Sequence, residues 1–141
     1  MITKEQENRL VKLAREAREK AYAPYSGYKV GAAALAESGK YYTGVNIENA
    51  AYTTALHAEL AAVAAAVAAG ERKFLSLAVV TENDPPPFPC AICRQGMAEF
   101  DQGEMLVIAA NLAGKTRKTT LKELYPHPFG SRQLGIDPTH Y

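Results

Sequence analysis

The chain has 141 residues, of which 48% are hydrophobic and 22% charged, and its formal net charge is +1. This length and balance predict a single globular domain over residues 1–141, large enough to bury a core without disulfide bonds. Lysines and arginines are scattered along the chain instead of forming a stripe, which argues against nucleic acid as a partner.

The expected elements of the N-terminal half are a helix from Thr3 to about Tyr22, strands over Tyr28–Ala36 and Tyr41–Val45, and a helix from about Thr54 to Ala69. Thr3 and Gln6 form a capping-box pattern that predicts the start of the first helix. Turn residues at 37–40 join the two strands into a hairpin. The alanine-rich run predicts a buried central helix, too short to cross a bilayer comfortably and closed by Gly70.

The expected elements of the C-terminal half are a strand over Leu75–Thr81, a helix from Ala91 to about Phe100, a strand over Met105–Ala109, a weak strand around Arg117–Thr119 and a short helix over Leu121–Leu124. The first of these strands is continuously apolar, which is typical of a strand covered on both faces. Helices alternate with strands, so the sequence predicts a three-layer α/β/α domain with a mixed sheet of about five strands.

The cysteines and the N-terminal residues indicate in which cellular compartment the protein is expected. Cys90 and Cys93 are the two cysteines of the chain, and two thiols three residues apart are more typical of a metal or redox site than of a structural disulfide. Residues 1–9 are charged and lack the apolar segment of a secretion signal. We therefore expect a cytoplasmic protein with no membrane partner.

Two short motifs, separated by twenty-nine residues of sequence, together indicate a zinc site. The first is His57-Ala58-Glu59 and the second is Pro89-Cys90-Ala91-Ile92-Cys93. Two thiolates and an imidazole suit tetrahedral Zn²⁺, and three protein ligands leave one position open for water. H-x-E followed by P-C-x-x-C is the known signature of zinc-dependent base deaminases.

The spacing of these residues carries a geometric prediction. Cys90 and Cys93 share one face once a helix begins, and a helix N-terminus is expected to lower thiol pKa values. Residues two apart in a helix interior do not share a face, so His57 and Glu59 converge only at a helix start. We therefore expect two helix N-termini to face one metal.

Glu59 indicates catalysis, because a structural zinc site needs no carboxylate beside its ligands. Zinc lowers the pKa of its water to roughly 7, so a neighbouring glutamate can accept that proton. In an amidine-like ring such as cytosine, Glu59 would deliver it to N3 and later protonate the departing amine. Water is consumed and ammonia is released.

The chain resembles the small, homotetrameric, zinc-dependent cytidine deaminases over most of its length. The stretches that carry the resemblance are Tyr22-Ala23-Pro24-Tyr25-Ser26 with Lys29-Val30-Gly31-Ala32-Ala33, Asn46-Ile47-Glu48-Asn49-Ala50-Ala51-Tyr52, His57-Ala58-Glu59, and Pro89-Cys90-Ala91-Ile92-Cys93-Arg94-Gln95. The Asn46–Tyr52 stretch is typical of nucleoside deaminases within the wider zinc deaminase group. The resemblance implies one zinc per subunit and hydrolysis of cytidine and 2′-deoxycytidine to uridine and 2′-deoxyuridine in pyrimidine salvage. It leaves open whether N4-substituted or modified cytidines are accepted.

The resemblance also implies roles for residues outside the metal motif. Those within one subunit are Asn46 and Glu48 at the ribose 3′-hydroxyl, Tyr28 against the base, the Ala58 N–H at the base carbonyl, and Pro89 on the leaving-group side. Those that reach the site of a neighbouring subunit are Ala50, Tyr52 and Phe129. The active sites would then form only in the homo-oligomer, which the resemblance makes a tetramer.

Two features depart from many tetrameric members of the family. Those members have three cysteine ligands and an arginine after the catalytic glutamate, whereas this chain has His57 in place of the first cysteine and Leu60 in place of the arginine. Two thiolates and a neutral imidazole already balance Zn²⁺, so an apolar Leu60 is consistent with His57. The proline-rich loop Asp84–Pro89 is longer than in those members, and it affects the expected shape of the pocket around the amino group.

Other interpretations remain open at this level. A nucleic-acid deaminase shares the metal pattern but needs a basic or aromatic surface for the strand. A non-catalytic zinc-stabilised module would leave Glu59 without a role. Asn46 and Glu48 could instead cap a loop, Tyr52 and Phe129 could be ordinary core or interface aromatics, and Arg94 is expected to support structure and not to touch substrate.

Overall fold

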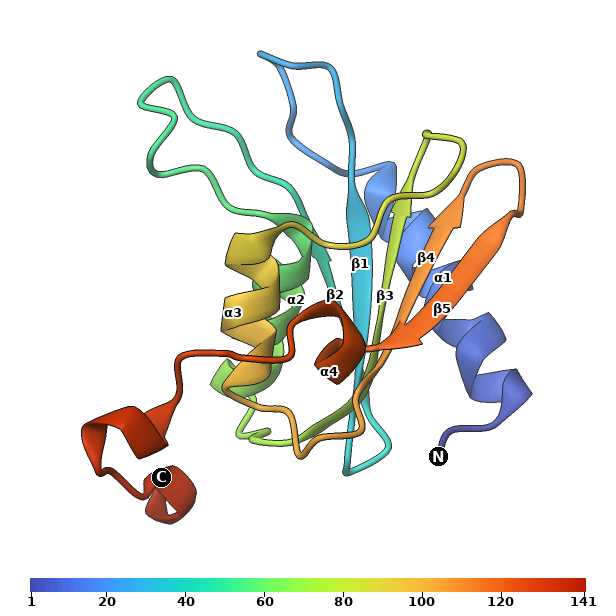
Figure 1. The fold of residues 1–141 in the computed structure, drawn as a ribbon. Helices are drawn as coiled ribbons and strands as arrows, with labels where there is room; N and C mark the ends of the chain where they lie inside the picture. The colour runs from blue at the N-terminus through green and yellow to red at the C-terminus, as the bar shows by residue number, and fades with distance from the viewer.

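A computed structural model describes all residues, 1–141, as a five-stranded sheet between two layers of helices (Figure 1). The α-helices are α1 (Lys4–Arg18), α2 (Ala58–Ala68), α3 (Ala91–Ala98) and α4 (Leu121–Leu124), and the strands are β1 (Gly31–Ala36), β2 (Tyr41–Val45), β3 (Phe74–Thr81), β4 (Leu106–Asn111) and β5 (Thr116–Thr120). Helix α1 covers one face of the sheet, and α2 and α3 lie on the other. The predicted α/β/α architecture is confirmed.

The strand order is β2-β1-β3-β4-β5, and β3 and β4 form the parallel pair in an otherwise antiparallel sheet. The chain crosses from β3 to β4 through α3, as a parallel connection requires. Both α2 and α3 therefore lie over the same sheet face, and the loops that precede them open at one end of the sheet. This topology brings together two sequence motifs that are far apart in the chain.

Two cores form because residues of β1 alternate between the faces of the sheet. Ala32, Ala34 and Ala36 face α2 and α3, in a cluster that includes Cys93 and Met97. Ala33 and Leu35 face α1, in a cluster built around Leu10 and Ala14. The small β1 side chains let the helices lie close to the sheet on both sides.

Helix α1 begins as predicted and ends earlier than predicted. Thr3 and Gln6 form the reciprocal capping box, but the helix stops at Arg18 and not at Tyr22. The reason is tertiary: Tyr22 forms a bridge to Ile47, and its N–H donates to the Asn46 carbonyl. The backbone is extended at Tyr22 because it pairs with Ile47, and the helical periodicity of the sequence gives no sign of that pairing.

The predicted strand Tyr28–Ala36 starts too early, because the Val30 N–H and the Tyr28 carbonyl bond to a side chain and not to a strand. The Asn46 amide accepts from the Val30 N–H and donates to the Tyr28 carbonyl. Regular pairing begins at Gly31. Tyr28 therefore lies in a loop.

The central helix also differs from its prediction. It starts at Ala58 and not near Thr54, because Leu56 exchanges two backbone hydrogen bonds with Ile47. It is not wholly buried: Ala62 and Ala66 face the core, whereas the other side of the helix, including Ala64 and Ala65, is exposed. Alanine content alone does not distinguish these two faces.

The remaining elements agree with prediction to within two residues at each end, and α4 agrees at both ends. Strand β3 is buried along nearly its whole length, as its apolar sequence predicts. Two short 3₁₀ helices, Ser131–Leu134 and Pro138–His140, were not predicted and belong to a C-terminal segment that projects from the body (Figure 1). None of the helices is long and apolar enough to span a membrane.

Candidate metal and catalytic site

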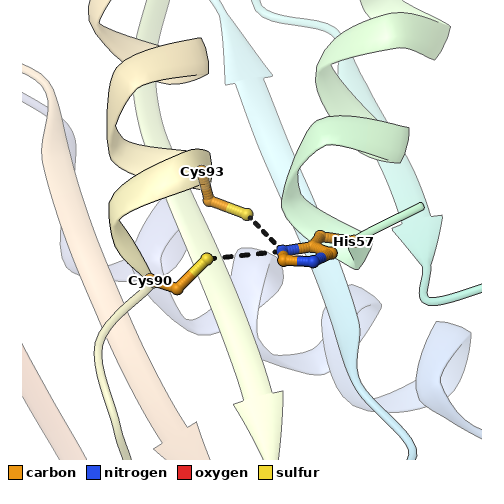
Figure 2. Close-up of side chains that lie close together, drawn as sticks. All are labelled: His57, Cys90 and Cys93. Carbon is orange, nitrogen blue, oxygen red and sulfur yellow. Dashed lines mark hydrogen bonds between the residues drawn. The ribbon is translucent and has the colours of Figure 1, made fainter. Parts of the chain in front are cut away.

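The three predicted ligands lie at two helix starts, as the spacing predicts. His57 is the N-cap of α2 and Cys90 is the N-cap of α3, and Cys93 lies one turn further along α3. Both sulfurs approach the same imidazole nitrogen, Nδ1, at 3.3 Å (Figure 2). The three donor atoms all lie within 4.8 Å of one another.

These distances fit a zinc ion. Zn–S bonds of about 2.3 Å and Zn–N bonds of about 2.0 Å at tetrahedral angles place sulfur and nitrogen about 3.5 Å apart. The 3.3 Å separations are close to that value. Both cysteines are free thiols, so a soft donor set is available in the right geometry.

The pKa of the Cys93 thiol is raised above its ordinary value. Burial raises the pKa of Cys93, and the charges of Glu59 and Cys90 raise it further. The expected lowering at a helix N-terminus is therefore outweighed for this residue by desolvation. A bound dication would reverse the balance, because a coordinating thiol loses its proton.

Glu59 lies in the first turn of α2 with only 7% of its surface exposed. The Cys93 thiol donates to its Oε2 over 3.5 Å, so the carboxyl group is next to the ligand cluster. Burying a carboxyl group costs folding free energy, which a helix with a purely structural role would have no reason to carry. Its position suits proton transfer beside a metal.

The site forms one wall of a cavity of about 330 Å³. The residues that line this cavity are Tyr28, Val30, Asn46, Glu48, Ala55, Leu56, His57, Ala58, Glu59, Val79, Thr81, Pro87, Phe88 and Cys90. The lining includes no lysine or arginine, and its two carboxylates are Glu48 and Glu59. The cavity therefore suits an uncharged ligand better than an anionic one.

The chain is similar to known proteins along most of its length. Residues 4–109 match the model of the cytidine and deoxycytidylate deaminase zinc-binding region. A cytidine deaminase of Sporosarcina psychrophila is 46% identical over 126 residues, covering 89% of this chain and 93% of the relative. The crystal structure of a cytidine deaminase from Burkholderia pseudomallei superposes with a TM-score of 0.84 at 42% identity, covering 91% of this chain and all of that one.

This chain belongs to the cytidine deaminase family. The resemblance inferred from its sequence motifs is confirmed, and so is its class as a hydrolytic enzyme. A second structure, the cytidine deaminase of Mycobacterium tuberculosis, has a TM-score of 0.76 at 38% identity and covers 87% of this chain and 96% of its own. The non-catalytic zinc module is thereby set aside.

Asn46 and Glu48 line the cavity and also support its wall. The Asn46 amide bonds the backbone of residues 28 and 30. The Glu48 carboxylate accepts from the N–H groups of Tyr25 and Ser26 and from the Ser26 hydroxyl. The loop-capping interpretation is thus correct for both. Asn46 Oδ1 and Glu48 Oε2 each accept one bond and keep lone-pair capacity for a ligand, whereas Glu48 Oε1 already accepts two.

Of three other residues predicted to contact substrate, Tyr28 and Ala58 line the cavity and Pro89 does not. Tyr28 lines the cavity and donates its hydroxyl proton to Asn83 Oδ1. Ala58 is buried at the start of α2, so its N–H has no acceptor within the helix. Pro89 is buried and does not line the cavity; its carbonyl accepts from Arg94 Nε at 2.6 Å.

Ala50, Tyr52 and Phe129 do not line the cavity of their own chain. Tyr52 and Phe129 are 72% and 58% exposed. The Tyr52 ring meets Tyr25 edge-on at 6.1 Å, and the Phe129 backbone is held at both its N–H and its carbonyl by Gln95. The interpretation of these two residues as core aromatics is therefore wrong.

Leu60 packs against α3, and Arg94 supports structure as expected. Leu60 lies over Gly96, where a Cβ atom would be 2.4 Å from its Cδ2. Arg94 donates to the Pro89 and Leu124 carbonyls, joining the start of α3 to α4. Arg94 therefore supports structure and does not line the cavity.

Sequence reasoning did not select Phe88 as a pocket residue. It lies in the proline-rich loop directly before Pro89 and lines the cavity with Pro87. An aromatic residue two positions before a ligand was the signal available. Leu56, Val79 and Thr81 carried no signal that separates them from ordinary strand residues.

Proposed function

We propose that the chain hydrolyses cytidine and 2′-deoxycytidine to uridine and 2′-deoxyuridine with release of ammonia, using one zinc ion per subunit held by His57, Cys90 and Cys93. One observation carries the proposal: three zinc-type donors and the Glu59 carboxyl converge on one wall of a cavity of about 330 Å³. That volume is at the lower end of the range for small-molecule sites.

Glu59 is the general acid and base in this proposal. When bound, zinc would supply a nucleophile at neutral pH by lowering the pKa of a water molecule. Glu59 accepts one proton of that water and passes it to N3 of the pyrimidine, and the remaining hydroxyl group adds to C4. The Glu59 carboxylate then takes the second proton, from the new C4 hydroxyl, and gives it to the amine as the C4–N bond breaks. One water enters and one ammonia departs, so the atoms balance.

The nucleoside is oriented by the residues on the other walls. The Ala58 N–H, free at the helix start, donates to the base carbonyl, and Tyr28 lies against the base. Asn46 and Glu48 accept the ribose 3′-hydroxyl with the lone pairs that their loop contacts leave available. Pro89 does not itself line the cavity; it would act on the leaving-group side through its neighbours Phe88 and Cys90, which do line it.

A nucleoside is preferred over a nucleotide or a nucleic acid strand. No lysine or arginine lines the cavity, and Glu48 adds a negative charge where a 5′-phosphate or a strand backbone would need a positive one. The pKa of Glu48 is lowered, chiefly by the hydrogen bond from the Ser26 hydroxyl, so this charge persists into mild acid.

The functional unit is a homotetramer with shared sites. Tyr52 and Phe129 expose large aromatic surfaces outside the cavity of their own chain. Helix α2 also exposes alanine side chains on one side. Such surfaces are typical of protein interfaces. With Ala50, these two aromatics complete the pocket of a neighbouring subunit. The enzyme acts in pyrimidine salvage in a reducing cytoplasm, which keeps both cysteines available to zinc.

Loss of ammonia, followed by ultraviolet absorbance, should be measured for cytidine, 2′-deoxycytidine, 2′-deoxycytidine 5′-phosphate, cytosine and a cytosine-containing oligonucleotide. The two nucleosides should react and the others should not. Chelation should abolish the activity and zinc should restore it. Preference for the phosphate or the oligonucleotide would overturn the assignment.

Glu59→Gln separates the catalytic role from metal binding. The variant should keep one zinc per subunit and lose turnover. A mixture of Glu59→Gln and Phe129→Ala chains, refolded together, tests the shared site. Mixed tetramers should regain activity that neither variant has alone, because some sites then contain both intact residues. No recovery from a confirmed mixed tetramer would contradict shared sites.

A further inference from the structure

The proline-rich loop between β3 and α3 is fixed by side chains from the β4–β5 hairpin, which does not itself line the cavity. Asn111 Nδ2 donates to the Asn83 carbonyl at 3.1 Å, and Lys115 Nζ lies 2.8 Å from Asp84 Oδ1. Figure 1 shows this loop and the β4–β5 turn at the same end of the sheet. Consecutive prolines cannot join a strand ladder, so these side chains supply the loop's contacts to the sheet.

Arg117 of β5 makes the contact closest to the cavity. Its Nη1 donates to the Pro86 carbonyl at 3.1 Å. Its guanidinium carbon lies 4.5 Å from the centre of the Phe88 ring, a cation–π distance. One side chain therefore holds both the backbone and the aromatic ring of the loop.

Phe88 is placed where it can select substrate. It is half-buried and lines the cavity together with His57, Glu59 and Cys90. In the proposed reaction the amino group on C4 must lie beside Glu59 and the ligand cluster. Phe88 comes two residues before Cys90 and lines the same cavity, so its large ring restricts the space for a substituent on that nitrogen.

We infer that Phe88 is a specificity-determining residue that excludes substituents on the cytosine amino group, and that Arg117 is the positioning residue that holds its ring in place. This inference rests on the proposed function. The substrate class it defines is nucleosides with a primary 4-amino group. N4-alkylated nucleosides are rejected.

The test is the ratio of kcat/KM for cytidine to kcat/KM for N4-methylcytidine. In Phe88→Ala this ratio should fall at least about 10-fold, because one methyl group in a tight pocket is worth about 10- to 200-fold in discrimination. In Arg117→Gln it should fall about 3- to 5-fold, since an exposed cation–π contact and one hydrogen bond are lost. Arg117→Lys keeps the cation and should recover part of the ratio.

Two controls make the result interpretable. Lys118→Gln changes the neighbouring cation, which pairs with Glu7 of α1 and not with the loop, and should leave the ratio unchanged. If Phe88→Ala does not fold, the same kcat/KM ratio can be measured with Phe88→Leu and with the Arg117 variants. An equal loss on both substrates in folded variants would show a structural role only and would overturn the inference. A wild-type enzyme inactive on both nucleosides would instead overturn the proposed function.

Discussion

Replacing Gly44 with alanine should disturb the active site from a position outside it. Gly44 is in β2, beneath the first turn of α2. A Cβ atom there would lie 2.3 Å from the Ala62 nitrogen, 2.4 Å from the Ala58 carbonyl oxygen and 2.8 Å from the Ala61 carbonyl carbon. All three are backbone atoms, so no side-chain rotation can relieve the overlap.

The size of the effect follows from these contacts. Ordinary contact begins near 3.4 Å, so the start of α2 must move by roughly 1 Å from the sheet. Overpacking of this kind costs about 1–3 kcal/mol, equivalent to about 3–10 °C in Tm for a chain of this size. His57 and Glu59 would move with the helix while Cys90 and Cys93 stay with α3. A misplacement of about 1 Å can reduce kcat on the order of 100-fold.

Three measurements on purified Gly44→Ala check the reasoning: Tm, zinc per subunit and kcat for cytidine. All three should fall. Thr43→Ala changes the exposed neighbour in the same strand and should remain within about 0.5 kcal/mol of wild type. A Gly44→Ala enzyme with wild-type Tm and kcat would show that α2 does not approach β2 as closely as the structure has it.

The remaining predictions concern charge, metal and pH. Leu60→Arg should lower Tm and kcat, because Leu60 fills the space over Gly96 and a zinc site with two thiolates and a neutral imidazole offers no surplus negative charge to a guanidinium; unchanged kinetics and melting would contradict this. Removing zinc with a chelator should lower Tm by about 5–10 °C, because a ligand at a hundredfold excess over its Kd stabilises by about 2.7 kcal/mol, and a Tm indifferent to chelator and zinc would be evidence against a metal at this site. The Glu48 pKa is lowered from its ordinary 4.5 by hydrogen bonds from Ser26 and Tyr25, so its stabilisation is present above that value and is lost as the pH falls through the lower folded value. The Tm difference between wild type and Glu48→Gln should therefore shrink below about pH 4.5, and a constant difference would mean that these bonds do not stabilise the ionised form.

The convergence of His57, Glu59, Cys90 and Cys93 could be predicted because each belongs to a local pattern with a chemical constraint. Cys90 and Cys93 are one helical turn apart, and His57 and Glu59 can converge only at a helix start. Those constraints depend on short stretches of backbone, and the structure places both motifs at helix starts. The capping box at Thr3 was predictable for the same reason.

The pocket walls could not be predicted in the same way. Tyr28 lies in a loop because the Asn46 side chain, from a distant part of the sequence, takes the hydrogen bonds that a strand would use. The start of α2 is set by the pairing of Leu56 with Ile47. Phe88 enters the cavity wall with support from Arg117, which lies on another strand. None of these contacts leaves a periodic signal near the residue it positions.

The sequence by itself determined the candidate donor atoms, the candidate carboxyl of Glu59 and the order of helices and strands, because ligand chemistry and hydrophobic periodicity act over a few residues. Only the tertiary structure decided how the two motifs meet, since that depends on the β3–α3–β4 crossover bringing α3 beside α2. It also decided the shape of the cavity, because groups remote in sequence position its walls, such as the Asn46 amide beside Tyr28 and Arg117 beside Phe88. Spatial neighbours of this kind are set by packing across the whole sheet, which no local stretch of residues specifies.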